Sequence, residues 1–111
     1  MKIDFSALEE RLVPGMRGGR GSARMKQFAD PDNRVLWIAL APGASIGGHR
    51  HDTSSETVYV LAGSGTVSTE SGEEKVQAGD CHYCPKGAWH SLANTGEGDL
   101  EIFAVIPEHG R

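Results

Sequence analysis

The chain alternates short runs of β-branched and aromatic residues with turn-forming residues, and this alternation restricts its possible folds more than any other feature. From Met25 onward such runs recur about every 8–12 residues, with clusters of Gly, Pro, Asn and Asp between them. The runs are Arg34–Ala41, Glu56–Leu61, Gly65–Thr69, Glu74–Gln77, Cys81–Cys84, Trp89–Ala93 and Leu100–Ile106. No helical pattern of roughly 10–15 residues separates them, which argues against βαβ units. We therefore predict an all-β sandwich or barrel.

The first 24 residues have a different character. Ser6 to Glu9 forms a capping-box pattern, which predicts a short helix that ends before Pro14. The following stretch, Arg17–Arg24, is rich in glycine and arginine and is predicted to be flexible. We accordingly expect an N-terminal helix and Gly/Arg-rich arm over 1–24, and a β domain over 25–111.

Length and charge narrow the class of protein further. A chain of 111 residues suits a single domain, and a net charge of -4 gives no general reason to expect nucleic-acid binding. No apolar run approaches the roughly 18–20 residues of a membrane span. Charged residues occupy the start of the chain, where a secretory signal needs an apolar stretch. We expect a cytoplasmic, soluble domain that binds neither nucleic acid nor a membrane.

Three of the five histidines form a pattern typical of metal ligands. His49 and His51 are two residues apart, so on an extended strand both side chains point to one face, with Cα atoms about 6.6 Å apart. Glu56 follows a turn-like segment, and His90 comes from a later strand. Three imidazoles and one carboxylate suit one divalent transition metal ion, with Fe, Mn, Ni, Cu and Zn all remaining open. His109, near the C-terminus, is expected to be an exposed tail residue.

The four candidate ligands belong to two sequence motifs, each with a fixed spacing between its residues. The first has the pattern G-x5-H-x-H-x4-E-x6-G from Gly43 to Gly63. The second has the pattern G-x5-P-x-G-x2-H-x3-N from Gly79 to Asn94, and 15 residues separate the two. Both patterns match the two motifs of the cupin superfamily at every fixed position. The chain therefore resembles a small, single-domain cupin of the conserved β-barrel type.

The resemblance implies a fold, a ligand set and a partner. The fold is an antiparallel jelly-roll β-barrel, here preceded by the short N-terminal helix. The metal ligands of the family correspond to His49, His51, Glu56 and His90, none of which is substituted. Small cupins are commonly dimers, so a homodimer is expected, and a monomeric mass in light scattering would contradict it.

Strand alternation predicts which neighbouring residues share the pocket. Since Glu56 is expected to point inward, Val58 should point inward too, and Tyr59 outward. Either His82 or Tyr83 offers an additional acid–base group, and the local register leaves open which of them faces the pocket.

The cysteines and the N-terminal arginines have two interpretations each. Cys81 and Cys84 form a C-x-x-C motif, which can indicate redox chemistry or half of a zinc site. On a strand they would face opposite sides with Cα atoms about 10 Å apart, so we expect free thiols. Arg17, Arg20 and Arg24 could bind a phosphate or carboxylate, but we favour a solvated arm.

Two classes of function remain open. The first is a mononuclear metal enzyme, dioxygenase-like or an isomerase or lyase, that acts on a small oxygen-rich metabolite chelated to the metal. We favour oxygen-dependent chemistry because the predicted pocket contains few acid–base residues. The alternative is a non-catalytic barrel that binds a metal or small ligand, for example as a sensor. A metal-independent sugar epimerase is disfavoured because the histidines are spaced as ligands.

Overall fold

The structure, a computed structural model, describes residues 1–110 and consists almost entirely of antiparallel β-strands. One sheet has six strands in the order β1-β2-β3-β10-β5-β8, and the other has four in the order β4-β9-β6-β7. The first contains β1 (Arg11–Pro14), β2 (Ser22–Ala29), β3 (Asn33–Leu40), β10 (Leu100–Pro107), β5 (Glu56–Ala62) and β8 (Cys81–Cys84). The second contains β4 (Ser45–Arg50), β9 (Trp89–Ala93), β6 (Ser64–Thr69) and β7 (Gly72–Gln77).

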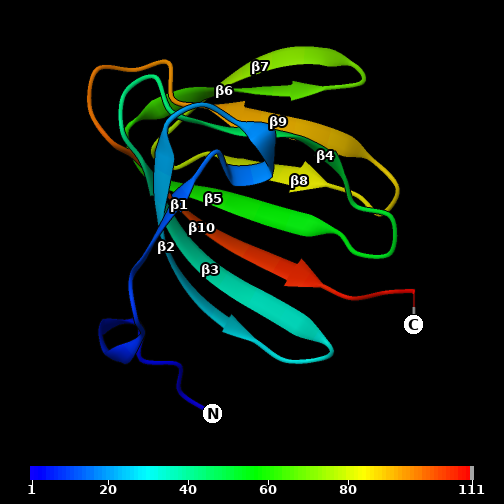
Figure 1. Cartoon of the computed structure of the whole chain (residues 1–111). Coiled ribbons are helices and arrows are strands. Elements are labelled where there is room, and N and C mark those ends of the chain that lie inside the picture. Colours follow the sequence, from blue (N-terminus) through cyan, green and yellow to red (C-terminus); the bar gives the residue numbers. More distant parts are fainter. Residues whose placement is uncertain (111) are drawn as a thin grey trace.

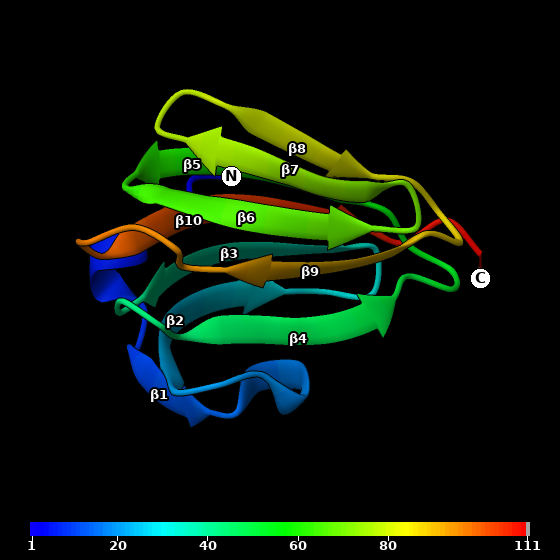
Figure 2. The same cartoon turned by 90° about the horizontal axis from the view of Figure 1, so that it is seen from above.

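The two sheets face each other in the predicted jelly-roll arrangement (Figures 1 and 2). Strand β10, the last along the chain, lies between β3 and β5, so that Ala104 is opposite Leu36 on one side and Val58 on the other. Between residues 1 and 110 the sheets remain separate and do not close into one continuous hydrogen-bonded barrel. The all-β, antiparallel prediction is confirmed.

The core lies between the sheets and follows from the alternation of apolar residues along each strand. In β5 every second residue is buried, so Glu56 and Val58 point inward while Tyr59 is 43% exposed. The largest fully buried side chains are Leu36, Ile38, Leu40, Leu100, Ile102, Val60 and Cys84. Burying side chains of this size supplies most of the stabilisation of such a domain. The predicted directions of these β5 side chains are confirmed.

The N-terminal segment differs from the expectation. The predicted helix is only a single 3-10 turn, η1 (Phe5–Ala7), and its N-cap is Asp4, whose carboxylate accepts a hydrogen bond from the Ser6 amide. The reason is that a single helical turn is costly to nucleate, whereas the residues that follow gain an interstrand ladder. Strand β1 pairs with β2 from Arg11 opposite Met25 onward. The boundary between residues 24 and 25 stays a prediction.

Exposed aromatic and aliphatic side chains mark the outer face of the larger sheet. Tyr59 and Leu61 on β5 and Tyr83 on β8 are 43%, 47% and 60% exposed. Such neighbouring apolar groups suit an interface, and the homodimer stays a prediction. Among residues 1–110, no helix is long and apolar enough to cross a membrane.

The two cysteines are free and should differ sharply in reactivity. Cys81 is exposed, whereas Cys84 is buried and its thiol contacts the Ala88 carbonyl. Burial raises the pKa of Cys84 to about 11, so at pH 8 it stays protonated and unreactive. We expect iodoacetamide to label one thiol per native chain and two after denaturation, measured by mass spectrometry. Equal labelling rates in the native protein would contradict this prediction.

Candidate metal centre

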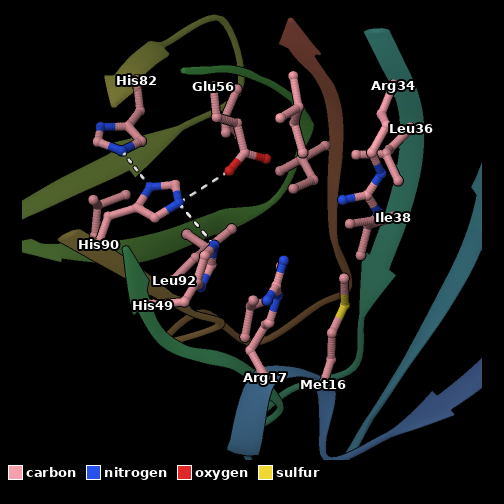
Figure 3. Close-up of a pocket in the computed structure, with 15 residues that line it drawn as sticks. Met16, Arg17, Arg34, Leu36, Ile38, His49, Glu56, His82, His90 and Leu92 are labelled. Atoms are coloured by element: carbon pink, nitrogen blue, oxygen red, sulfur yellow. Dashed lines mark hydrogen bonds and ion pairs between the residues drawn. The ribbon is translucent and has the colours of Figure 1, made fainter. Parts of the chain in front are cut away.

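Three strands and one loop bring the four predicted ligands together. His49 lies on β4, Glu56 begins β5, and His90 lies on β9, while His51 directly follows β4. Pairing of β4 with β9 places His49 opposite His90, and Glu56 approaches from the facing sheet. Figure 3 shows the three labelled ligands converging. One ligand atom from each of the four lies within 4.8 Å of those from the others.

The distances between donor atoms fit a transition metal. His90 Nε2 lies 2.9 Å from Glu56 Oε1, 3.1 Å from His51 Nε2 and 3.2 Å from His49 Nε2. His51 Nε2 is 3.0 Å from the same Glu56 oxygen. With metal–ligand bonds of about 2.1 Å, two donors at right angles are about 3.0 Å apart. Each of these four separations fits a pair of donors that share one metal ion.

The Nδ1 atoms of two ligand histidines have partners on the protein. His49 Nδ1 lies 2.9 Å from the Gly47 carbonyl oxygen, which can only accept, so the proton of a neutral His49 belongs on Nδ1. His51 Nδ1 lies 2.9 Å from Ser54 Oγ, on the loop before β5. Both contacts orient the rings, as outer-sphere partners do in metalloproteins. The Gly47 carbonyl leaves Nε2 of His49 available to a metal, and the Ser54 hydroxyl can accept from Nδ1 of His51 and so allow the same there.

His90 has a histidine as its outer partner. His82 on β8 places its Nε2 2.9 Å from His90 Nδ1, and the two rings stack with an interplanar angle of 29°. His82 lies opposite the inward-facing Val58 and is half-buried, whereas Tyr83 is exposed. The structure thus answers the question left open by the sequence: His82 faces the pocket. Burial lowers the pKa of His82, with a further lowering from His90, which favours a neutral ring.

The electrostatics of Glu56 and His49 favour the protonation states that a metal needs. Burial acts to raise the pKa of Glu56, but hydrogen bonds from His51 and His90 outweigh it and hold this pKa at about 2. Burial lowers the pKa of His49, although its hydrogen bond to Gly47 acts in the opposite direction. An ionised carboxylate and neutral imidazoles are the forms that bind divalent ions.

The cluster forms one end of a small, mostly apolar cavity of about 40 Å³. Its aliphatic and thioether lining consists of Met16, Leu36, Ile38, Ile46, Val58, Val67, Leu92, Ile102 and Ile106. One water needs about 10–15 Å³ of such a cavity, so the cavity has room for about three waters or for a ligand of a few heavy atoms.

Two arginines interrupt this apolar lining. Arg34 on β3 is held by Gln27 on β2, whose side-chain oxygen accepts from Arg34 Nε at 3.1 Å and from a terminal nitrogen at 2.7 Å. Desolvation and the nearby charge of Arg17 lower the pKa of Arg34, whereas Glu56 raises it. Figure 3 shows Arg17 and Arg34 reaching into the cavity from the side opposite His82. The cavity therefore combines a ligand cluster with two cationic groups.

Close backbone packing fixes the position of Arg17. It lies in the 3-10 turn η2 (Met16–Gly18) with φ 54°, the left-handed region that favours glycine. The turn lies directly on β4: a Cβ at Gly47 would collide with the Arg17 carbonyl oxygen, and one at Gly19 with the Ser45 carbonyl oxygen. The two glycines thus allow the Gly/Arg-rich segment to close one side of the cavity.

The expectation of a solvated arm holds for only part of this segment. Arg17 is exposed but also lines the cavity, contrary to that expectation. Arg24 instead lies over the Trp37 ring at 5.4 Å and forms exposed ion pairs with Glu10 and Asp99. Arg20 is exposed.

The fifth histidine lies apart from the ligand cluster. His109 is exposed, as predicted, and its Nε2 lies 2.7 Å from Ser55 Oγ. Its amide donates to the Thr53 carbonyl. The C-terminal segment therefore holds the loop between two ligands without contributing a donor to the cluster.

Comparison with known proteins supports the assignment that these features suggest. A family profile described as the cupin domain matches residues 36–106, well over half of the chain. The chain is a cupin. It is 33% identical over 112 residues to a Thermotoga maritima protein named oxalate-binding protein, covering 96% of this cupin and 93% of the relative.

Two other relatives cover most of this cupin. A crystal structure of a predicted oxalate decarboxylase from Thermotoga maritima superposes with a TM-score of 0.90 and 32% identity, covering 97% of this chain and 99% of that one. The pectin degradation protein KdgF of Dickeya dadantii is 29% identical over 77 residues, covering 69% of this cupin and 70% of the relative.

Among the charged residues that line the pocket of this cupin, Arg34 was not predicted from the sequence. Its position contained a usable signal, because Arg34, Leu36 and Ile38 alternate along β3 and therefore share a face. A charged residue in register with two core residues is unusual and points inward toward a partner or a ligand.

Proposed function

We propose that this cupin holds one divalent transition metal ion through His49, His51, Glu56 and His90, and binds a small dicarboxylate or similar oxygen-rich dianion there. One observation carries the proposal: two arginines face the ligand cluster across an otherwise apolar cavity. The metal, when bound, supplies Lewis-acid chemistry and two positions for ligand oxygens.

The charges in the cavity favour an anion with more than one negative group. A divalent ion beside the Glu56 carboxylate keeps about one positive charge, and Arg17 and Arg34 add two. Glu56 is the one carboxylate among the described residues that line the cavity. Guanidinium groups form strong, paired hydrogen bonds with carboxylates. A dianion would neutralise most of this positive charge, whereas a neutral ligand would leave it uncompensated.

The size of the cavity and the relatives support the same ligand class. Room for about three waters suits a ligand of a few heavy atoms. A Thermotoga maritima relative is named an oxalate-binding protein, and a similar solved structure from the same organism is described as a predicted oxalate decarboxylase. Oxalate, with two carboxylates on adjacent carbons, fits both the chelation and the charge requirement.

The apolar lining favours a second candidate function, turnover of the chelated ligand. His82 is the one histidine lining the cavity, in the described chain, that is not among the four ligands. With so few acid–base groups, the metal would carry most of the chemistry, as in a dioxygenase-like reaction; an isomerase or lyase reaction needs an additional proton carrier. Oxygen consumption with candidate substrates tests this function, and equal turnover without O2 would exclude its oxygen-dependent form.

Calorimetry on the metal-loaded protein tests the binding function. We expect oxalate to bind the Mn²⁺-loaded protein. Acetate should bind at least about tenfold more weakly, because it has one negative charge and cannot bind the metal through two carboxylates. Neither anion should bind the metal-free protein with comparable affinity. Equal affinities for oxalate and acetate, or oxalate binding that is independent of metal, would contradict the proposal.

A further inference from the structure

One histidine near the ligand cluster has no role in the proposal above. His82 is absent from the set of four converging donors, yet its Nε2 lies 2.9 Å from Nδ1 of His90. Figure 3 shows His82 behind His90, on the far side of that ring from His49 and the arginines. His82 therefore contacts a ligand without being placed to bind the same metal.

The hydrogen-bond chemistry of His90 gives this contact a specific consequence. A neutral imidazole carries one proton, on either Nδ1 or Nε2. Since Nε2 of His90 faces the other donors, binding a metal there requires the proton on Nδ1. That proton then needs an acceptor, and the atom within hydrogen-bond distance of Nδ1 is His82 Nε2.

An imidazole is a better hydrogen-bond partner for His90 Nδ1 than a group that can only accept. Without a metal, His90 Nε2, which is 2.9 Å from Glu56 Oε1, can donate a proton to it, so Nδ1 can accept from His82. With metal at Nε2, the direction of the His82–His90 bond reverses. A carbonyl like that of Gly47, which serves His49, can only accept, whereas His82 can serve in both states.

The position of His82 makes this reversal feasible. When its Nε2 accepts, the neutral His82 ring carries its proton on Nδ1. His82 also lines an outer groove with Thr69, Glu70, Ser71 and Glu74, so the ring borders a polar, open surface as well as the metal cavity. When the metal binds, His90 Nε2 releases a proton to solvent, the Nε2 proton of His82 passes to His90 Nδ1, and His82 Nδ1 takes up a proton from solvent. The number of protons on the two rings is therefore unchanged.

We propose that His82 is a positioning residue of the metal centre: it accepts the Nδ1 proton of His90 and so directs the Nε2 lone pair of His90 to the metal. The proposal rests on the metal site of the proposed function, but not on the identity of the organic ligand. It assigns a part in metal binding to His82 on β8, which occupies a variable position of the second motif.

Zn²⁺ affinity measured by competition with a chelator tests the proposal. We expect His82→Phe, which keeps a planar ring without an acceptor, to bind Zn²⁺ about 10–100-fold more weakly than the wild type, as is typical when a ligand loses its outer partner. His82→Gln retains an amide oxygen acceptor and should recover most of the loss. Tyr83→Phe, on the exposed neighbour in the same strand, is the matched control and should bind as the wild type does.

Proton NMR of the Zn²⁺-loaded protein separates positioning from a merely structural role. We expect a downfield, slowly exchanging His90 Nδ1 proton in the wild type and in His82→Gln, and its loss from the spectrum of His82→Phe through faster exchange. Unchanged Zn²⁺ affinity in a folded His82→Phe variant, or a retained slow proton there, would overturn the proposal. Absence of Zn²⁺ binding by the wild type would instead overturn the metal site itself.

Discussion

Replacing His90 with alanine is expected to abolish stoichiometric metal binding. His90 Nε2 lies within 3.2 Å of the donor atoms of the three other ligands, so its removal opens the middle of the cluster. A four-ligand site for Zn²⁺ provides roughly 10–16 kcal/mol, so one ligand accounts for about 3–4 kcal/mol, or several hundredfold in affinity. Elemental analysis of protein purified without an affinity tag or added metal measures the effect.

The matched control for this variant is His109→Ala. It removes the same type of side chain from an exposed position outside the cluster. The backbone bonds that join the C-terminal segment to Thr53 and Ser55 remain, so the metal content should stay unchanged. Thermal unfolding of both variants without metal shows whether the fold is intact. Equal metal contents in the wild type and a folded His90→Ala variant would contradict the assignment of the site.

Removing the two cavity arginines is expected to weaken dicarboxylate binding while leaving the metal bound. Each charge-assisted pair contributes about 1.5–3 kcal/mol, so Arg17→Met and Arg34→Met should each lower oxalate affinity by about 10–100-fold. Methionine preserves much of the aliphatic volume and removes the charge. Calorimetry with Mn²⁺-loaded protein measures the affinity, and elemental analysis confirms the metal content.

Arg20→Met is the control for the arginine variants, because Arg20 belongs to the same Gly/Arg-rich segment and is exposed like Arg17, but lies outside the cavity lining. Its oxalate affinity should match that of the wild type. If the Arg17→Met/Arg34→Met double variant kept full oxalate affinity, the ligand would not be held through charge. The proposed dianion class would then be wrong.

Several strands could be predicted because their side chains alternate. Glu56–Leu61 and Leu100–Ile106 were expected as strands, and both lie within β5 and β10. Strands β1 and β2 were missed because Arg11–Pro14 and Ser22–Ala29 carry mixed polar sequences, and pairing with a neighbour decides their conformation. The expected helix near Ser6 is present only as a 3-10 turn, because the local pattern exists but the turn buries no residue that would support a longer helix.

The candidate ligands could be predicted because the chemistry of a metal site depends on residue types at short, regular spacings. His49 and His51 are two apart on one strand face, and Glu56 and His90 occupy the remaining motif positions. The spacing of these four residues is either local or part of a motif, so it can be recognised in the sequence without a structure. The linear sequence by itself therefore determined the fold class and the four candidate ligands.

The tertiary structure decided which other groups share the cavity. Arg17 enters because two glycines let its turn lie directly on β4, and Arg34 enters because β3 faces the ligand strands across the core. His82 meets His90 because β8, on the edge of one sheet, comes close to β9 in the other. Contacts of this kind depend on the register and approach of strands that are distant along the chain. They come from long-range packing, which no short stretch of residues encodes.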